Sequence, residues 1–255
     1  MSFPTGFDIA IGATTGWRSI KIEGRNTTVA QSYVPICPSG TYRTPQVGSQ
    51  TALRIRAGGN AADSASGAGA RAVRLYGLDV NGLEVSEVIE TAGASASALS
   101  STQFLRLLEA RVVSSGTYAT QSAGSHLADI VIEDGAGNFW ASIPLNGFPE
   151  SRSRIGAFTV PADYECFLHG IRVNADSAKT VDALVFQRSG ILETAAPYSP
   201  MSLITELFNV TGFEDLGYAA PIPVPAMTDI GILAKVDVQT ARVGCGLGLY
   251  LRRIG

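Results

Sequence analysis

Charged side chains are scarce in this chain. Lys, Arg, Asp and Glu together make up 16% of the 255 residues, whereas a typical soluble domain carries about 25%. The net charge is −3, and the basic residues are scattered along the sequence. Nucleic-acid binding depends on a basic stripe that neutralises phosphates, so we expect no nucleic-acid partner. A low charge content also fits a protein that covers much of its surface with neighbouring copies.

Cysteine and histidine are also few. The sequence contains three cysteines, Cys37, Cys166 and Cys245, and two histidines, His126 and His169. The cysteines are far apart and form no Cys-x-x-Cys pair, so we expect buried free thiols rather than a zinc site or a redox motif. His169 lies in an apolar segment and is interpreted as a core or interface residue. We expect neither a metal nor a cofactor.

The motifs of common catalytic sites are missing as well. There is no Gly-x-Ser-x-Gly nucleophile elbow and no phosphate-binding P-loop. Ser125 adjoins His126, but neighbouring side chains on a strand point to opposite faces, which disfavours a catalytic pair. Glu133 and Asp134 are adjacent at a predicted turn, where we expect solvated carboxylates rather than the facing pair of a glycosidase. We therefore expect no enzymatic activity.

Long hydrophobic runs are absent. The N-terminal sequence, Met-Ser-Phe-Pro-Thr-Gly-Phe-Asp, has neither the basic segment nor the apolar segment of a signal peptide. No apolar stretch approaches the ~18 residues that a transmembrane helix needs. We expect synthesis in a cytoplasm and no membrane contact.

The sequence does contain many short segments in which apolar and polar residues alternate, a pattern typical of β-strands with one buried face. The Asn81-Gly82 pair favours a type I′ hairpin turn, and the turn at 134–137 predicts a second hairpin. Residues 104–113 fit either a short helix or a strand, and the small residues of 57–70 predict a mobile surface loop. The strands predicted in the first half are 17–23, 52–56, 71–78, 83–91, 129–133 and 138–143.

A stretch rich in Pro, Gly and Ser at 144–157 indicates a domain boundary. We expect an all-β protein with two β-sandwich or jelly-roll-like domains. Residues 1–148 would form an N-terminal β domain, and residues 149–255 a C-terminal jelly-roll-like β-sandwich domain. The strands predicted in the second half are 158–162, 165–174, 180–188, 201–210, 229–236 and 241–254.

Prolines and glycines single out two segments as candidate interfaces. Proline lacks the N–H that a central strand donates, so the segment with Pro221, Pro223 and Pro225 suits an edge strand or an extended connection. The last predicted strand carries Gly at every second position, which leaves one face without side chains and allows a neighbour to approach closely. These glycines are Gly244, Gly246 and Gly248.

Three segments carry a resemblance to a known family. Residues 59–91 include Gly-Ala-Gly-Ala-Arg-Ala-Val-Arg-Leu-Tyr-Gly-Leu-Asp-Val-Asn-Gly, residues 158–168 read Phe-Thr-Val-Pro-Ala-Asp-Tyr-Glu-Cys-Phe-Leu, and residues 225–230 read Pro-Ala-Met-Thr-Asp-Ile. The pattern resembles virion structural proteins of tailed phages, of the jelly-roll type found as head decoration, cement or collar-associated proteins. Asp163 stands where the family pattern has glycine, which affects only a local turn.

The resemblance implies a virion component, made in the host bacterial cytoplasm, and brings no catalytic residues with it. The leading hypothesis is a capsid decoration or cement protein that forms a homo-oligomer, by family analogy a trimer, and binds the major capsid protein or other virion proteins. The alternative is a collar, fibre or spike component that binds host-surface glycan, with Tyr42, Tyr118 and Trp140 as candidate aromatic contacts. A third hypothesis, an enzyme such as a depolymerase, is disfavoured because the sequence shows no paired-carboxylate or triad signature.

If the glycine face of the last strand is an interface, Gly246→Leu will weaken assembly more than it weakens folding, because the new side chain keeps the neighbour away. Native mass and thermal unfolding of the variant measure the two effects separately. An unchanged oligomer mass would count against the interface.

Overall fold

The structure is a computed structural model that describes residues 4–38, 50–117, 124–145, 150–176, 178–193 and 195–254. It confirms the all-β prediction: the five-residue helix α1 (Gly6–Ala10) accompanies antiparallel strands. Within the described ranges, no helix is both long and apolar enough to cross a membrane. The chain divides into two compact units, unit 1 with Met1–Gly40 and Gly156–Gly255, and unit 2 with Thr41–Ile155.

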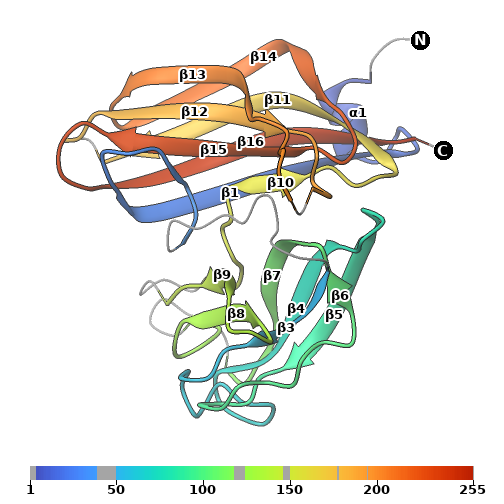
Figure 1. Ribbon diagram of the computed structural model, residues 1–255, viewed down its shortest axis with the longest axis vertical. Helices are drawn as coiled ribbons and strands as arrows, with labels where there is room; N and C mark the ends of the chain where they lie inside the picture. Colours follow the sequence, from blue (N-terminus) through green and yellow to red (C-terminus); the bar gives the residue numbers. More distant parts are fainter. Residues whose placement is uncertain are drawn as a thin grey trace. The chain divides into compact units, whose positions relative to one another are not determined.

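Unit 1 is a sandwich of two antiparallel sheets (Figure 1). Its strands are β1 (Trp17–Val29), β2 (Val34–Pro35), β10 (Ala157–Thr159), β11 (Tyr164–Ala175), β12 (Val181–Arg188), β13 (Ser202–Val210), β14 (Phe213–Val224), β15 (Asp229–Val236) and β16 (Ala241–Arg253). One sheet has the order β1-β16-β11-β14. The other has the order β10-β15-β12-β13, with β2 added beside β15.

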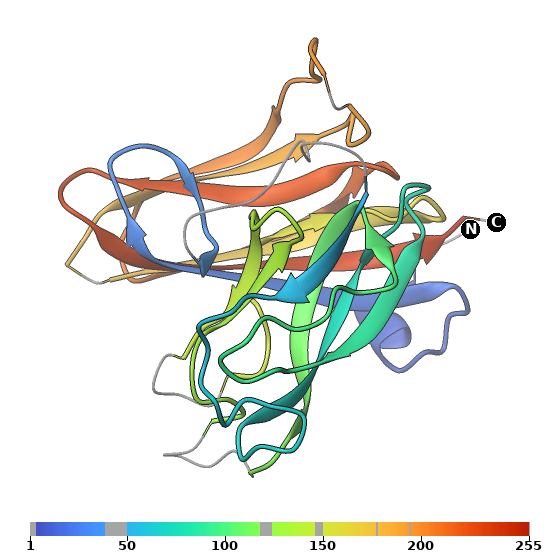
Figure 2. The ribbon, with the colours of Figure 1, turned by 60° about the horizontal axis from the view of Figure 1, so that its bottom comes forward.

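The first forty residues belong to the same unit as residues 156–255. The predicted boundary at 148/149 had placed them in the N-terminal domain instead. Strand β1 pairs with β16 from Trp17 opposite Arg252 to Asn26 opposite Val243, and the two strands run side by side in Figure 2. The start of the chain therefore forms a sheet with its end. A linear composition scan cannot detect this, because the pairing joins segments separated by the whole of unit 2.

The core of unit 1 follows from alternation along the strands. On β16 the odd-numbered residues point inward, and apolar side chains at alternate positions of β15 and β12 belong to the same buried core. Burial removes apolar area from water, the main favourable term in folding. Cys37, Cys166 and Cys245 are buried and form no disulfide, as predicted. Desolvation raises the pKa of the Cys166 thiol to about 12. The inward residues of β16 are Val243, Cys245, Leu247, Leu249 and Leu251.

Unit 2 contains two smaller sheets. Its strands are β3 (Thr51–Ile55), β4 (Ala70–Leu78), β5 (Glu84–Glu90), β6 (Gln103–Phe104), β7 (Arg106–Ser115), β8 (Ile130–Asp134) and β9 (Phe139–Ile143). The sheet orders are β6-β3-β8-β9 and β5-β4-β7. The segment 104–113, which fitted a helix or a strand, is largely strand β7. Both predicted hairpins, β4–β5 and β8–β9, are present.

The turn of the first hairpin is not the predicted type I′ turn. Of the Asn81-Gly82 pair, only Gly82 has a positive φ, +74°, whereas type I′ needs two. The Gly82 N–H donates to the Asp79 carbonyl oxygen, and the Asp79 carboxylate accepts the N–H groups of Asn81 and Leu83. The result is a three-residue loop, a type I turn closed by a left-handed glycine.

The second hairpin uses the same chemistry. The Gly137 N–H donates to the Asp134 carbonyl oxygen at 3.0 Å, and Gly137 has a φ of +84°. The Asp134 carboxylate accepts the N–H groups of Ala136 and Asn138. Asp at the first position and Gly at the fourth are what both turns share, and this spacing, rather than Asn-Gly, is the sequence signal.

The loop at 57–70, predicted to be mobile, is ordered around a buried carboxylate. Asp63 is 5% exposed and accepts N–H groups from Ala70 at 2.8 Å, Leu127 at 3.0 Å and Ala128 at 3.1 Å. Small residues let the backbone turn tightly around this side chain. A Cβ at Gly69, for example, would lie on the Asp63 carboxylate.

Asp63→Ala is expected to lower the free energy of unfolding by about 3 kcal/mol, because one buried and two part-buried N–H groups lose their acceptor. Asp79→Ala, in an exposed turn, serves as the matched control, with an expected loss below about 1 kcal/mol. Urea unfolding of both variants makes the comparison. Equal losses would show that Asp63 acts as an ordinary turn residue.

Candidate functional site

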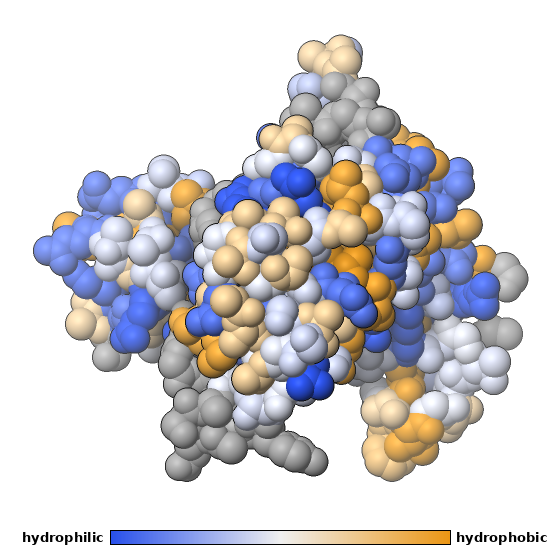
Figure 3. All heavy atoms as spheres, turned by 90° about the horizontal axis from the view of Figure 1, so that it is seen from below, coloured by the Kyte–Doolittle hydropathy of each residue, from blue (hydrophilic) through white to orange (hydrophobic). Residues whose placement is uncertain are grey.

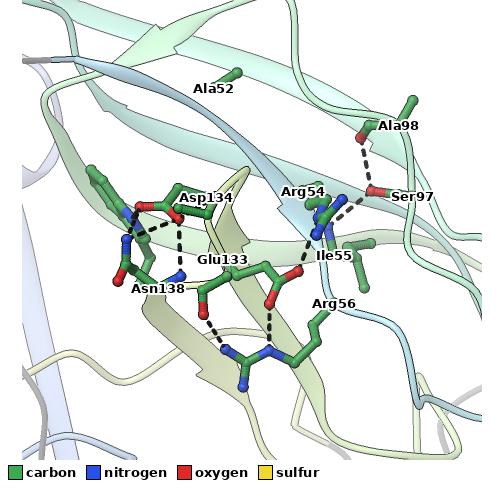
Figure 4. Close-up of polar contacts among 12 residues, drawn as sticks. Ala52, Arg54, Ile55, Arg56, Ser97, Ala98, Glu133, Asp134 and Asn138 are labelled. Atoms are coloured by element: carbon green, nitrogen blue, oxygen red, sulfur yellow. Dashed lines mark hydrogen bonds and ion pairs between the residues drawn. The ribbon is translucent and has the colours of Figure 1, made fainter.

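The carboxylate pair singled out in the sequence is buried rather than solvated. Glu133 is 4% exposed and lies between two guanidinium groups of one segment, as Figure 4 shows. Arg54 Nε donates to Oε1 at 2.9 Å, and Arg56 Nε donates to Oε2 at 2.5 Å. Burial alone would raise the pKa of Glu133, but the hydrogen bonds and charges of Arg56 and Arg54 outweigh it and lower that pKa.

Asp134 is occupied by its own turn. In addition to the two backbone N–H groups, its carboxylate accepts from Asn138 Nδ2 at 2.9 Å and from the Trp140 indole at 3.4 Å. Both carboxylates of the pair are thus engaged in structural hydrogen bonds. Trp140, a candidate glycan contact, is 8% exposed and belongs to the core. Tyr42 and Tyr118, the other two candidates, lie outside the described residues.

Ser125 and His126 do meet, contrary to the prediction. Residues 124–129 are irregular backbone, so the alternation of a strand does not apply, and Ser125 Oγ lies 2.9 Å from His126 Nδ1. Both side chains are buried, and the serine hydroxyl donates to the Glu150 carbonyl oxygen at 2.7 Å. The serine proton is therefore directed at a backbone carbonyl rather than at the imidazole.

The glycines of β16 lie in a central strand, with their missing side chains on the outer face of the sheet. Side chains of this same chain fill two of the three spaces. A Cβ at Gly248 would lie 2.6 Å from the His169 ring, and a Cβ at Gly244 would lie 2.6 Å from the Asn174 amide. Gly246 has only ordinary contacts at 3.7 Å and beyond. Their role in an interface with another copy stays a prediction.

A row of glycines crosses the sheet at right angles to this strand. Gly248 of β16 is in register with Gly170 of β11, and Gly170 is in register with Gly217 of β14. Beside the row, β11 contains a bulge in which His169 is the extra residue between Leu168 and Gly170. Bulges redirect side chains, and here the His169 ring stacks on Tyr250 with centroids 4.1 Å apart.

The glycine row forms the floor of a depression of about 330 Å³, which we call the glycine hollow. The Lys21 side chain lies at the β1 end, and His169 and Arg172 rise from β11. Asp215 lines it from β14. Gly170 and Gly217 were not predicted as site residues, because each is an isolated glycine in the sequence and only the strand register brings them together. The hollow is lined by residues that include Lys21, His169, Gly170, Arg172, Gly217 and Gly246.

The charges around the glycine hollow are paired. Lys21 lies 2.9 Å from Glu23, and Arg172 Nη2 lies 2.9 Å from Asp215. Desolvation by burial lowers the pKa of His169, so its imidazole is neutral at neutral pH. The hollow therefore presents hydrogen-bonding groups without a large net charge.

A second candidate surface is the free edge formed by β13 and β14, each the last strand of its sheet. The two strands lie together at one edge of the sandwich in Figure 1. Pro221 and Pro223 are in this edge strand, as predicted, and Pro225 follows directly after it. Large apolar side chains are exposed along the edge: Met201 (45%), Leu203 (60%), Phe208 (63%) and Phe213 (57%).

Such an edge is unusual. A single large apolar side chain on a surface is common, but a run of them along strands that are paired on one side only is not. By contrast, on the face shown in Figure 3, apolar residues lie in small groups among polar ones.

Within the described part of the chain, no cluster of three or more His, Cys, Asp or Glu side chains is arranged to hold a metal ion.

No family model matches the chain, and no curated protein matches it. Two solved structures are similar over most of the chain at 7% sequence identity. The match to a structure of the infectious bursal disease virus Gx strain covers 93% of this chain and 72% of the viral chain, with a TM-score of 0.25. The match to the crystal structure of the infectious bursal disease virus VP2 subviral particle covers 94% of this chain and 77% of the viral chain, with a TM-score of 0.17. Scores this low do not establish a shared fold.

The stability of unit 2 is expected to fall in acid. Burial would raise the pKa of Glu87, but hydrogen bonds from Ser101 and Thr102 outweigh it and lower that pKa to about 2. A carboxylate with a lowered folded-state pKa stabilises the fold above its unfolded pKa of about 4.5. That contribution is lost as the pH falls toward about 2.

Glu87→Gln should reduce the loss of unfolding free energy between about pH 5 and about pH 2. Glu90→Gln, an exposed position on the same strand, is the matched control. Urea unfolding at several pH values measures the slope. Identical slopes for Glu87→Gln and the wild type would contradict the assignment.

Proposed function

We propose that this chain is a structural protein of a virus particle, specifically a tailed-phage capsid decoration or cement protein that self-assembles and binds the major capsid shell. The observation that carries the proposal is the free edge of β13 and β14. The sequence resemblance supports the assignment to a tailed phage. The trimeric state is proposed by analogy with the same family.

The physical argument rests on what the edge exposes. The outermost strands of a sheet offer backbone N–H and C=O groups without strand partners, and exposed apolar side chains beside them favour association. Leu203 and Phe208 are both at least 60% exposed on β13. Pro221 and Pro223 remove backbone donors from the second half of β14. A partner would therefore cover β13 and the first half of β14, and in the proposed oligomer this partner is a second copy.

The second candidate function is a collar or fibre component that binds host-surface glycan. The glycine hollow is the observation that favours it, because it offers hydrogen-bonding side chains around an open depression. The two functions are compatible on one chain, because a partner at the edge pairs with backbone groups of β13 and β14, whereas the hollow opens on the outer face of the sheet that contains β11, β14 and β16.

We also propose that the chain has no catalytic activity. The pairs that could do acid–base or nucleophilic chemistry are held in structural roles. Glu133 is bound by two arginines, and the Ser125 hydroxyl donates to a backbone carbonyl.

The oligomer tests the proposal. We expect the purified wild-type protein to have a defined multiple of the 26.6 kDa chain mass and to co-sediment with isolated phage heads. The double variant Leu203→Lys/Phe208→Lys should be monomeric, because two desolvated lysines at the edge oppose association. Val88→Lys, at an exposed apolar position of β5, is the matched control and should keep the oligomer. Light scattering and sedimentation provide the masses.

A monomeric wild type that ignores phage heads would overturn the decoration role. If the double lysine variant still forms the oligomer, the protein assembles, but the β13–β14 edge is not the interface.

A further inference from the structure

The glycine hollow is a shaped feature of the sheet. Three glycines on three adjacent strands lower its floor, and they are Gly170, Gly217 and Gly246, whereas the His169 ring lies over Gly248. At Gly217 no atom lies within 4 Å of the position that a Cβ would take, so side chains of the surrounding strands do not fill that end. The space of about 330 Å³ is near the lower end of the range for small-molecule sites, about 300–1,000 Å³. A ligand the size of one sugar ring fits this volume.

The polar groups at the rim include both donors and acceptors. Arg172 Nε and Nη2 both donate to a single oxygen of Asp215, Oδ2, at 3.3 and 2.9 Å. The other oxygen, Oδ1, keeps acceptor capacity in a side chain that is 47% exposed. The ammonium group of Lys21 supplies donors on the opposite side of the hollow, and a neutral His169 ring supplies one donor and one acceptor.

This inventory suits hydroxyl groups better than anions. A hydroxyl both donates and accepts, so it can bond a carboxylate oxygen and a guanidinium at once. An anion would meet the Asp215 carboxylate at the rim, and the two cations near the hollow are already paired with Glu23 and Asp215. The floor is glycine backbone without side chains, so a sugar ring can lie flat against it.

We propose that the glycine hollow binds a neutral saccharide unit, with Asp215 and Arg172 as its principal hydrogen-bonding residues and Lys21 and His169 at the opposite rim. Gly217 and Gly246 give the ring its access to the floor. The inference rests on the glycan-binding candidate function and names its class of ligand. It does not depend on the assembly role, because every residue of the site belongs to one chain.

The test is direct binding of simple sugars to the full chain. Saturation-transfer NMR with the methyl glycosides of glucose, galactose, mannose and N-acetylglucosamine identifies a neutral ligand, and titration gives its affinity. Glucuronic acid and N-acetylneuraminic acid are the acidic probes. We expect at least one neutral glycoside to bind with millimolar affinity and the acidic sugars to bind more weakly.

Two variants locate the site. Gly217→Leu fills the hollow without a clash at its Cβ and should abolish binding. Asp215→Asn should weaken binding about tenfold, the size expected for one hydrogen bond to a charged group. Ala219→Leu and Glu214→Gln, exposed positions on the same strand outside the hollow, are the matched controls and should bind as the wild type does. Thermal unfolding confirms that each variant is folded.

Several outcomes would overturn the proposal. One is a wild type that binds no neutral glycoside, and another is binding that survives Gly217→Leu. Preference for the acidic sugars would also reject it, since it would assign the hollow to anions. None of these binding results depends on the native mass of the protein. Loss of the saccharide site can therefore be distinguished from loss of the proposed assembly.

Discussion

The antiparallel pairing of β1 with β16 is the constraint on which unit 1 depends. Because the first long strand closes onto the last, β16 becomes a central strand with neighbours on both sides. A central strand buries one face in the core, which explains Val243, Leu247 and Leu251 on its odd positions. It also directs its even positions outward, so the glycines at 244, 246 and 248 lie on the outer surface. The same closure makes unit 1 discontinuous in sequence.

Much of the fold could be predicted, because strands and hairpins are encoded locally. Alternation located most strands, and the prolines correctly marked β14 as an edge. The predictions that failed concern residues with distant partners. Asp63 looked like part of a flexible loop, yet it accepts N–H groups from Leu127 and Ala128 more than sixty residues away. Glu133 looked solvated because its two arginine partners lie on β3 and just beyond it, about eighty residues earlier in the sequence.

The candidate site was even less accessible from the sequence. The glycines of β16 drew attention because they recur at every second position, whereas Gly170 and Gly217 are single glycines in unrelated segments. Only the registers of β11 with β16 and with β14 align them into one row. The bulge at His169 could not be predicted either. An extra residue in a strand reverses which later residues point inward and which point outward, and nothing in the residue types of β11 marks where this happens. Register, rather than residue type, creates the hollow.

Strand β14 links the two candidate surfaces physically. Phe213, exposed on the free edge, lies under the Arg172 guanidinium at 5.4 Å from the ring centroid, and Arg172 in turn pairs with Asp215 of the same strand. A copy that covered Phe213 would remove water from around this guanidinium, which strengthens its attraction to both the ring and the carboxylate. Assembly through the edge would thus hold the Arg172–Asp215 pair in a fixed geometry at the rim of the hollow. The structural role and the binding role would then reinforce each other through one arginine.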